Sequence, residues 1–349
     1  MATAYARNRC RERLARLADS SLDTEAVQQE AIADLQQVIG FDRWCWPLGD
    51  PQSLIPLGGI ALHDYGPQVG RGLELEFSGA DFAAMDAVAQ WRTAAGSLSA
   101  ATHGDLARSL RWDEVLRPVG IGDEAVLACR DETGCWGWIK AYRNSGERSF
   151  DEDDLELLVA VGPSLATALR RRIHAGSNGA ACEPGVIVLD ADLRPAGWTA
   201  AARDWIDAMG MAALFAAWGI LPPVVYALGA LARTGDGTRR AQAVHQSAGG
   251  GWVRIEAARL EGWDDGRIAL SFTSPGPAEM FELLCRAHAL SARERELVAA
   301  LTEGLDTKAL AERLAISPHT VQDHLKSIFE KAGVRSRREL LARFGGASA

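Results

Sequence analysis

The stretch LAERLAISPHTVQDHLKSIFEK, residues 310–331, decides the fold of the C-terminal region because it holds two helical patterns separated by a short turn. Ser317 followed by Pro318 is typical of a helix start, since serine accepts a hydrogen bond from a free first-turn amide and proline lacks the N–H that would stay unpaired there. Gly333 suits the left-handed residue that ends a helix. We therefore predict a helix from Ser317 to Ala332, preceded by a shorter one.

Capping patterns flank this pair of helices. Ser291–Glu294 and Ser336–Glu339 both fit the capping box, in which each end residue's side chain accepts from the other residue's free backbone amide. Asp306 can cap the shorter helix, Thr307–Leu314. These patterns predict an all-α, four-helix unit. Its apolar residues recur at helical spacing: Leu297, Val298, Leu301, Leu305, Leu310, Leu314, Val321, Leu325, Ile328 and Phe329.

Proteins that bind the DNA major groove through a helix-turn-helix have two short helices joined by a tight turn. A helical bundle without DNA-binding function can have the same pattern. The residues themselves favour the first interpretation. The segments LSAREREL (290–297), EGL (303–305), residues 310–331 and GVRSR (333–337) resemble the LuxR-type helix-turn-helix. The resemblance implies a regulator of transcription that binds double-stranded DNA, with the helix from Ser317 as its recognition helix.

The resemblance also assigns roles by position. Base contacts in the family fall just after the Thr-Val pair and four residues beyond, which gives Gln322, Asp323 and Lys326 here. The first turn of the recognition helix and the basic stretch after it are expected near phosphates. A solvated charged surface is the alternative for the arginines. The expected phosphate neighbours are Ser317, His319, Thr320, His324, Arg335, Arg337 and Arg338.

This sequence departs from the family at two positions. Residue 322 is commonly Lys but is Gln here, which favours adenine over guanine, and Asp323 beside it can accept from cytosine N4. The operator sequence of relatives therefore does not transfer to this chain. Ala309 stands where a helix-capping Glu is usual, and we expect that change to lower stability slightly and to leave recognition intact.

Breaker-rich stretches divide the rest of the chain. Residues 174–184 and 274–278 are rich in Gly, Pro and small polar residues and are predicted to be linkers. They define three domains, at residues 1–173, 184–274 and 287–349.

The first domain has an α+β pattern in which helices cover an antiparallel sheet. The run from Gly122 to Arg172 resembles the end of a GAF domain, a small-molecule-sensing module. A strand at Gly134–Tyr142, the helix start Phe150–Asp154 and a long closing helix carry the resemblance. The expected elements are helices at 4–18, 23–39 and 155–173 and strands at 43–48, 124–130 and 135–143.

The middle domain has a second α+β pattern. A buried strand in Pro184–Arg194 with an Asp-containing turn opens it, and the order of its elements is similar to a compact PAS domain. The expected fold is thus multidomain, with a GAF-like, a PAS-like and a helical DNA-binding part. The further elements expected in the middle domain are helices at 200–209 and 222–233 and strands at 241–246, 252–260 and 268–273.

Charge is spread unevenly over the 349 residues. The chain carries a net charge of −9, whereas residues 287–349 hold 10 Lys and Arg against 8 Asp and Glu. A mildly basic end on an acidic body is compatible with DNA contact at that end.

No targeting or membrane segment is indicated. The arginine-rich segment Met1–Arg16 is not followed by the apolar stretch of a signal peptide, and no apolar run could span a bilayer. We therefore expect a cytoplasmic protein that does not contact membranes.

Tryptophan is unusually frequent, and this favours a ligand-binding sensor. Six of the eleven lie in the GAF-like segment, and strand alternation places two pairs of them on shared faces. We hypothesise that some of them line an apolar pocket for a small, aromatic effector, with plain core packing as the alternative. The candidate ligand-binding residues are Trp44, Trp46, Trp91, Trp112, Trp136 and Trp138.

Other forms of control and function are less well supported. The six cysteines include no C-x-x-C pair, and Cys129 with Cys135 is the one candidate redox pair; control by redox state or by protein–protein contacts is the alternative to a ligand. A receiver domain, a P-loop, a nucleophile elbow and metal-spaced ligands are not indicated, so we predict no enzyme activity and no cofactor, although haem or bilin on a lone His or Cys stays open. A homodimer is expected because two half-sites raise affinity, and RNA polymerase is a further expected partner.

Overall fold

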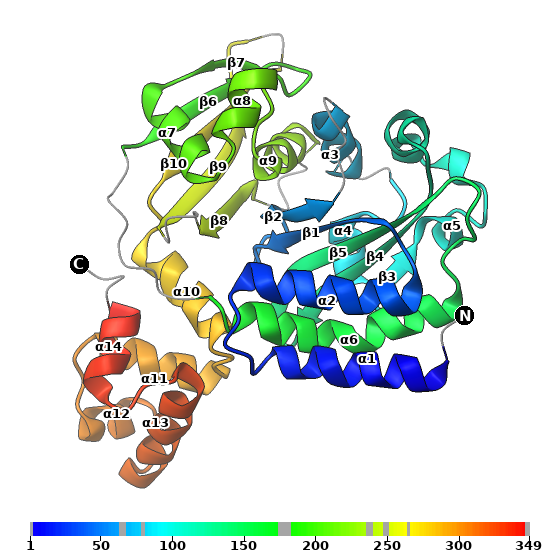
Figure 1. Ribbon diagram of the computed structural model, residues 1–349. Coiled ribbons are helices and arrows are strands. Elements are labelled where there is room, and N and C mark those ends of the chain that lie inside the picture. The colour runs from blue at the N-terminus through cyan, green and yellow to red at the C-terminus, as the bar shows by residue number, and fades with distance from the viewer. Residues whose placement is uncertain are drawn as a thin grey trace. The chain divides into compact units, whose positions relative to one another are not determined.

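The computed structural model describes residues 3–62, 68–77, 81–173, 183–234, 240–246, 251–263 and 266–345 (Figure 1). The chain forms two compact units. The first comprises Met1–Arg172 with Ser177–Ser274, and the second comprises Ile173–Gly176 with Pro275–Ala349. Most of the predicted linker 174–184 lies outside the described residues.

A five-stranded antiparallel sheet in the order β2-β1-β5-β4-β3 occupies the first part of the N-terminal unit. Its strands are β1 (Arg43–Gly49), β2 (Pro56–Leu62), β3 (Ala95–Ser97), β4 (Ile121–Asp131) and β5 (Gly134–Asn144). Leu127 of β4 faces α6, because a Cβ at Gly162 of that helix would lie 3.2 Å from its Cδ1. Residues beside Leu127 in the strand point to the opposite face.

Helices α1 (Ala4–Leu17), α2 (Thr24–Ile39) and α6 (Glu152–Arg170) pack together on one side of this sheet (Figure 1). Their starts agree with the capping pattern of the sequence. Asp23 caps α2 by accepting from the Ala26 amide at 2.8 Å, and Gly40 closes that helix with a φ of 76°. Asp151 and Asp154 form a capping box at the start of α6, so this helix begins and ends three residues earlier than expected.

The opposite side of the sheet is covered by short helices. They are α3 (Val69–Phe77), α4 (Met85–Gln90), α5 (Leu98–Ala101), η2 (Leu106–Arg108), η3 (Trp112–Leu116) and η4 (Arg117–Val119). These elements, like β2 and β3, were not predicted from the sequence. Their patterns are too short to show a period, and their places follow from the sheet on which they pack.

The second part of the N-terminal unit holds another five-stranded antiparallel sheet, in the order β7-β6-β10-β9-β8. Its strands are β6 (Gly185–Leu189), β7 (Pro195–Trp198), β8 (Gln242–Gln246), β9 (Trp252–Arg259) and β10 (Ile268–Thr273). Its helices are α7 (Ala200–Ala208), α8 (Ala212–Trp218) and α9 (Pro223–Thr234). Two antiparallel sheets with helices agree with the predicted α+β character.

The two sheets share one hydrophobic core. Helix α9 is buried on nearly every side, because it packs on its own sheet and also on α3 and β2 (Figure 1). The buried carboxylate of Asp50, next to β1, accepts from the amide of Val244 in edge strand β8 at 2.8 Å. Arg233 of α9 also pairs with Glu74 of α3 at 2.6 Å. The two sheet regions therefore form one packed body.

The C-terminal unit is helical. It contains α10 (Pro277–Ala287), α11 (Ala292–Thr302), α12 (Thr307–Arg313), α13 (Pro318–Ala332) and α14 (Arg337–Gly345). The predicted linker 274–278 is wrong at its end, because Pro277 is the first residue of α10, where a missing N–H has no cost. In the described part of the chain, no helix has the length and apolarity to cross a membrane.

Candidate nucleic-acid interface and sensor core

The pair α12 and α13 has the predicted helix-turn-helix form. Asp306 caps α12 by accepting from the Ala309 amide at 2.8 Å, and Ala315 in the turn has a φ of 51°. Ser317 then caps α13 through the Thr320 amide at 3.1 Å. Gly333 ends α13 with a φ of 64°, as its position in the sequence predicts.

The two faces of α13 differ sharply. Val321, Leu325 and Ile328 are buried in a core that α11, α12 and α14 complete. Gln322, Asp323 and Lys326 are exposed on the opposite face. These three side chains, assigned to base contacts, are therefore free of the protein core and can enter a groove.

The other predicted DNA-contacting residues lie mostly at the surface of the same unit. Ser317, His319 and Arg335 are exposed, and Thr320 and His324 are half-buried. Ser317 has a structural task as well, since its hydroxyl caps the helix and lies 2.9 Å from the Thr320 hydroxyl.

Arg337 is half-buried, and its guanidinium donates to the backbone carbonyl of Leu305. This contact connects the start of α14 to the segment between α11 and α12.

The second predicted capping box is wrong by one residue. Ser336 accepts from the Glu339 amide at 3.2 Å, but the Glu339 carboxylate accepts from the amide of Arg335 at 2.8 Å.

Asp323 has a partner on its own helix that was not predicted. His319, one turn earlier, places its Nδ1 3.0 Å from Asp323 Oδ2, and both side chains are largely exposed, at 88% and 67%. The spacing of four residues brings them onto the same side of the helix. Oδ1 of Asp323 and Nε2 of His319 take no part in this contact.

Glu294 links the first helix of the unit to α13. Its carboxylate accepts from the Ser291 amide at 2.6 Å, which closes the predicted capping box, and also from the Ser327 hydroxyl and Lys331 Nζ, each at 2.7 Å. Burial alone would raise the pKa of Glu294, but Lys331, the Ser291 amide and Ser327 lower it to about 2. The capping box was predicted from the sequence, but the contacts with Ser327 and Lys331 were not, because these residues lie 33 and 37 positions away.

The family comparison agrees with this geometry. The family model "Bacterial regulatory proteins, luxR family" matches residues 288–344. These residues form a LuxR-type helix-turn-helix domain. The match covers α11 to α14, including the exposed face of α13.

Proteins with similar sequences match this chain over short stretches. The "Monoamine regulon transcriptional regulator" of Klebsiella aerogenes is 46% identical over 54 residues, 16% of this chain and 24% of that protein. The "Probable transcriptional regulatory protein SgaR" of Hyphomicrobium methylovorum is 47% identical over 53 residues, 15% of this chain and 25% of that protein. "Transcriptional regulatory protein DesR" of Bacillus subtilis is 34% identical over 67 residues, 19% of this chain and 34% of that protein. The chain thus spans about a third or less of these relatives.

A structural comparison pairs the whole chain with Escherichia coli SdiA. The alignment covers 98% of this chain and 99% of SdiA, with 13% sequence identity and a TM-score of 0.32. A likeness this small assigns no fold to the region before the LuxR-type domain.

The six tryptophans predicted to bind a ligand do not gather at one place. Trp44 and Trp46 are buried on the sheet face toward α2 and α6, where the Gln28 side chain donates to the Trp46 carbonyl at 3.0 Å. Trp138 is buried on the other face and donates to the Met85 carbonyl at 2.7 Å. Their positions agree with the core-packing alternative, and a ligand role for them stays a prediction.

The remaining three tryptophans have separate surroundings. Trp112 is half-buried and donates to the Ile121 carbonyl at 3.1 Å. Trp136 is buried and donates to the Thr133 hydroxyl at 2.9 Å, next to a register shift that interrupts the alternation between Trp136 and Trp138. Trp91 is half-buried and lines a surface groove.

A buried ionic network lies on the sheet face that Trp138 shares. Arg111 donates to Asp81 at 2.5 Å and forms a bidentate pair with Glu124, at 3.1 and 2.6 Å. Lys140 bridges Glu124, at 2.9 Å, and Glu76, at 2.8 Å. All five side chains are at most 4% exposed. The network joins α3, the segment before α4, the start of η3 and strands β4 and β5.

The charges of this network support one another. Burial alone would raise the pKa of Glu124, but Arg111 and Lys140 beside it hold that pKa well below its ordinary value. Burying charges is tolerable only when every one is paired. The alternation Trp138-x-Lys140-x-Tyr142 in a buried strand was the sequence signal for this network, because a lysine on a buried face needs carboxylate partners.

The cysteines in the described part of the chain do not have the surroundings of reactive thiols. Cys129 and Cys135 are buried and free, and burial raises the pKa of Cys135 to about 12 and that of Cys129 well above its ordinary value. Thiols with such a high pKa form little thiolate near neutral pH.

Proposed function

We propose that this protein is a sequence-specific DNA-binding regulator of transcription. The observation that carries the proposal is the exposed face of α13, with Gln322, Asp323 and Lys326, on a domain that matches the luxR family over residues 288–344. In this proposal, α13 enters the major groove, the three side chains contact base edges, and Thr320, His324 and the first-turn amides lie near phosphates.

The proposal includes control by a small-molecule effector that binds the N-terminal unit, in a GAF-like domain at residues 1–173 or a PAS-like domain at residues 184–274. Binding there would bias the presentation of the LuxR-type domain. The alternative is a ligand-independent regulator that responds to protein–protein contacts. The high pKa of the buried thiols argues against redox control.

DNA binding can be tested with the full-length protein. Duplexes selected from a random pool give the operator, and fluorescence anisotropy at rising salt gives the number of phosphate contacts, because each contact releases counterions. We expect Lys326→Ala to weaken operator binding, whereas Arg259→Ala, a loss of charge at an exposed position of β9, should leave binding unchanged. Equal binding by the Lys326→Ala and parent proteins would contradict the assigned role of α13.

Effector control needs a separate measurement. All eleven tryptophans precede Pro275, so their fluorescence reports on the N-terminal unit alone. We expect a small aromatic effector to quench this fluorescence and to change operator affinity at the same concentration. A compound that changes operator affinity without altering the N-terminal emission would place the effector site elsewhere.

A further inference from the structure

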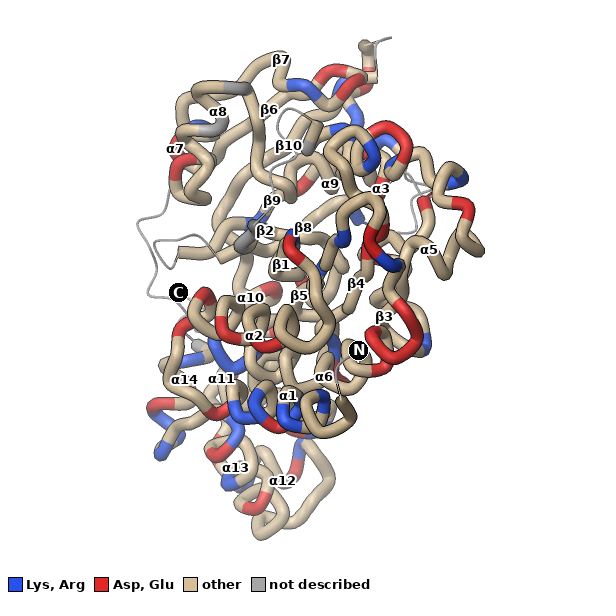
Figure 2. The backbone as a smooth tube through the Cα atoms, turned by 45° about the vertical axis from the view of Figure 1, so that its right-hand side comes forward, with Lys and Arg blue, Asp and Glu red and all other residues tan. Residues whose placement is uncertain are grey.

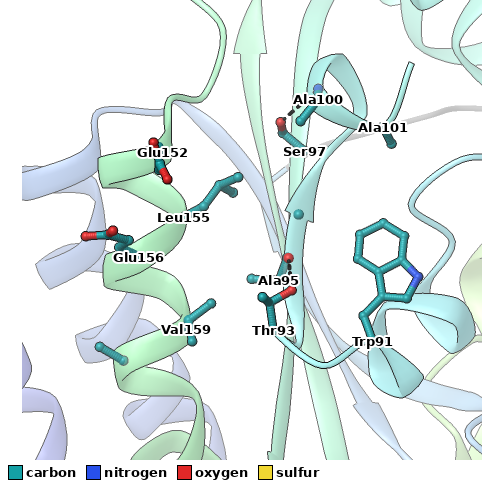
Figure 3. A pocket seen from close by; sticks show the side chains of 12 residues that line it. Trp91, Thr93, Ala95, Ser97, Ala100, Ala101, Glu152, Leu155, Glu156 and Val159 are labelled. Carbon is teal, nitrogen blue, oxygen red and sulfur yellow. Dashed lines mark hydrogen bonds between the residues drawn. The ribbon is translucent and has the colours of Figure 1, made fainter. Parts of the chain in front are cut away.

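An open apolar groove runs along α6 in the N-terminal unit. Its volume is about 570 Å³, and it lies between α6 on one side and edge strand β3 with α5 on the other (Figure 3). Leu155 and Val159 point from α6 toward the strand, and Ala95 and Ala100 lie opposite them. Val159 is 37% exposed, which leaves an apolar side chain in contact with water inside an apolar groove.

Trp91 and two glutamates complete this groove. The Trp91 indole packs so closely on β3 that a Cβ at Gly96 would lie 2.4 Å from its Cζ3. Glu152 and Glu156 are exposed at the N-terminal end of α6, and Figure 3 shows the Glu156 carboxylate directed away from the strand. The groove therefore has an apolar floor and an acidic rim.

A basic helix lies on the other side of α6. Figure 2 shows Lys and Arg gathered along α1. Of its five arginines, Arg7 pairs with Asp153 and Arg13 pairs with Asp34, which leaves the others without an ion pair among the described residues. The outward face of α1 carries Tyr5, which is 71% exposed, with the Arg9 guanidinium 5.8 Å from the centre of its ring. Exposed Glu12 also lies on this helix and is bonded to Asn8 at 2.9 Å.

The helices α1 and α6 are parallel and in register. Arg7 meets Asp153 near the two helix starts, and Arg172 donates to the carbonyls of Leu17 and Leu22 near the two helix ends. One face of the N-terminal unit therefore consists of the basic helix α1, the exposed side of α6 and, next to it, the groove with an acidic rim.

We propose that a second copy of this chain docks on this face, with α1 of each protomer seated in the groove of the other. A two-fold axis running along α6 exchanges the basic side with the acidic side, as a symmetric interface between identical chains requires. Rotation about this axis leaves the position of every residue along the axis unchanged. The Tyr5–Arg9 turn of one protomer therefore meets the Glu152–Glu156 turn of its partner. The Tyr5 ring then lies beside Leu155 in the groove, and the unpaired Arg9 approaches the glutamates.

The docking extends the proposed function, since a symmetric dimer would supply two LuxR-type domains to two half-sites. The charge match favours a second copy over an unrelated partner, because both halves of the complementary surface are on one chain. A free apolar amine could also use the acidic rim, but it would not require Arg9.

The test is sedimentation equilibrium of the full-length protein with matched variants. We expect Val159→Asp to raise the dimer dissociation constant about tenfold or more, because it places a carboxylate beside the glutamates in a desolvated contact. Val186→Asp is the control: Val186 is an equally exposed valine, at 38%, on β6. An unchanged dimer in Val159→Asp, an equal effect in Val186→Asp, or a monomeric parent at all concentrations would overturn the proposal.

Charge reversal gives a second, independent result. Arg9→Glu and Glu156→Arg should each weaken the dimer, and the combined variant should recover most of the loss. Additive weakening would overturn the proposed pairing.

Fluorescence anisotropy with DNA that carries a single half-site distinguishes failure of the proposed dimer from failure of DNA binding. Val159→Asp should keep the half-site affinity of the parent and lose only cooperative binding to two half-sites, whereas a parent that binds no DNA would refute the proposed function and leave the sedimentation result intact.

Discussion

The LuxR-type domain and the N-terminal unit place their charged residues in opposite ways. In the LuxR-type domain the core is apolar apart from the single buried carboxylate of Glu294, and Gln322, Asp323 and Lys326 of α13 face outward. In the N-terminal unit five paired charges lie inside, on a sheet face beside Trp138. The first arrangement leaves polar atoms available to a partner, and the second uses them to hold a core together.

The largest expected effect tests the second arrangement. Lys140→Met removes one of two cations from a buried network with three carboxylates, and we expect a loss of about 3–5 kcal/mol in the unfolding free energy of the N-terminal unit. Urea denaturation followed by tryptophan fluorescence measures it, because all the tryptophans lie in that unit. Arg194→Met, at an exposed ion pair, is the control and should leave the midpoint unchanged. A small loss in Lys140→Met would mean that the network is dispensable.

The next effect tests the outward face of α13. Gln322→Ala should relax preference at one base pair by roughly 1–3 kcal/mol, because the proposed bidentate contact of Gln322 to adenine would be lost. A binding assay across all single-base variants of the operator measures it, with unfolding followed in parallel to show that stability is unchanged. Retention of the full base preference in Gln322→Ala would remove this residue from direct readout.

A smaller effect is expected at Glu294, which is a buried charge in contact with Ser327 and Lys331 of α13. Its pKa is lowered from 4.5 to about 2 in the folded protein, so it stabilises the fold above pH 4.5, and the contribution is lost as the pH falls from 4.5 toward 2. Glu294→Gln should lack this acid dependence and lose on the order of 1–2 kcal/mol at neutral pH.

Hydrogen exchange in peptides from α13 reports this loss locally. The variant and the parent are compared at the same pH, from 5 down to about 3, so that intrinsic exchange rates cancel. Parallel pH profiles for the two proteins would contradict the role of Glu294.

The smallest effect concerns a capping position. Ala309→Glu should add the missing partner to the Asp306 cap of α12 and stabilise the LuxR-type domain by roughly 0.5 kcal/mol, without change in operator preference. Protection of α12 amides from exchange measures the gain. Reduced protection would show that the Asp306 cap is already complete.

The two regions also differ in how far the sequence predicts them. Short-range patterns define the LuxR-type domain: Ser317, Pro318 and Gly333 place α13 to the residue, and the outward positions of Gln322 and Lys326 follow from its period. The long strands and helices of the N-terminal unit were predicted for the same reason. The partner of Asp323 could also have been read from the spacing of His319, since residues four apart face each other.

Contacts between distant segments could not be predicted in this way. Strand β3 has three residues and exists because it pairs with β4, and the partners of Lys140 lie on segments 64 and 16 residues away in the chain. The same reason explains the tryptophans. Alternation predicts correctly that Trp44 and Trp46 share a face, but it cannot reveal that Trp138 lies on the other side of the sheet.

The common core of the two sheets has a consequence for how such a chain can be recombined. Because α9 packs on both sheets and Asp50 satisfies an amide of β8, a cut after residue 173 would expose apolar surface on both fragments. A chimaera that uses this N-terminal unit should therefore include the chain through Thr273 as one piece and join the helical domain of another protein at Pro277, the first residue of α10.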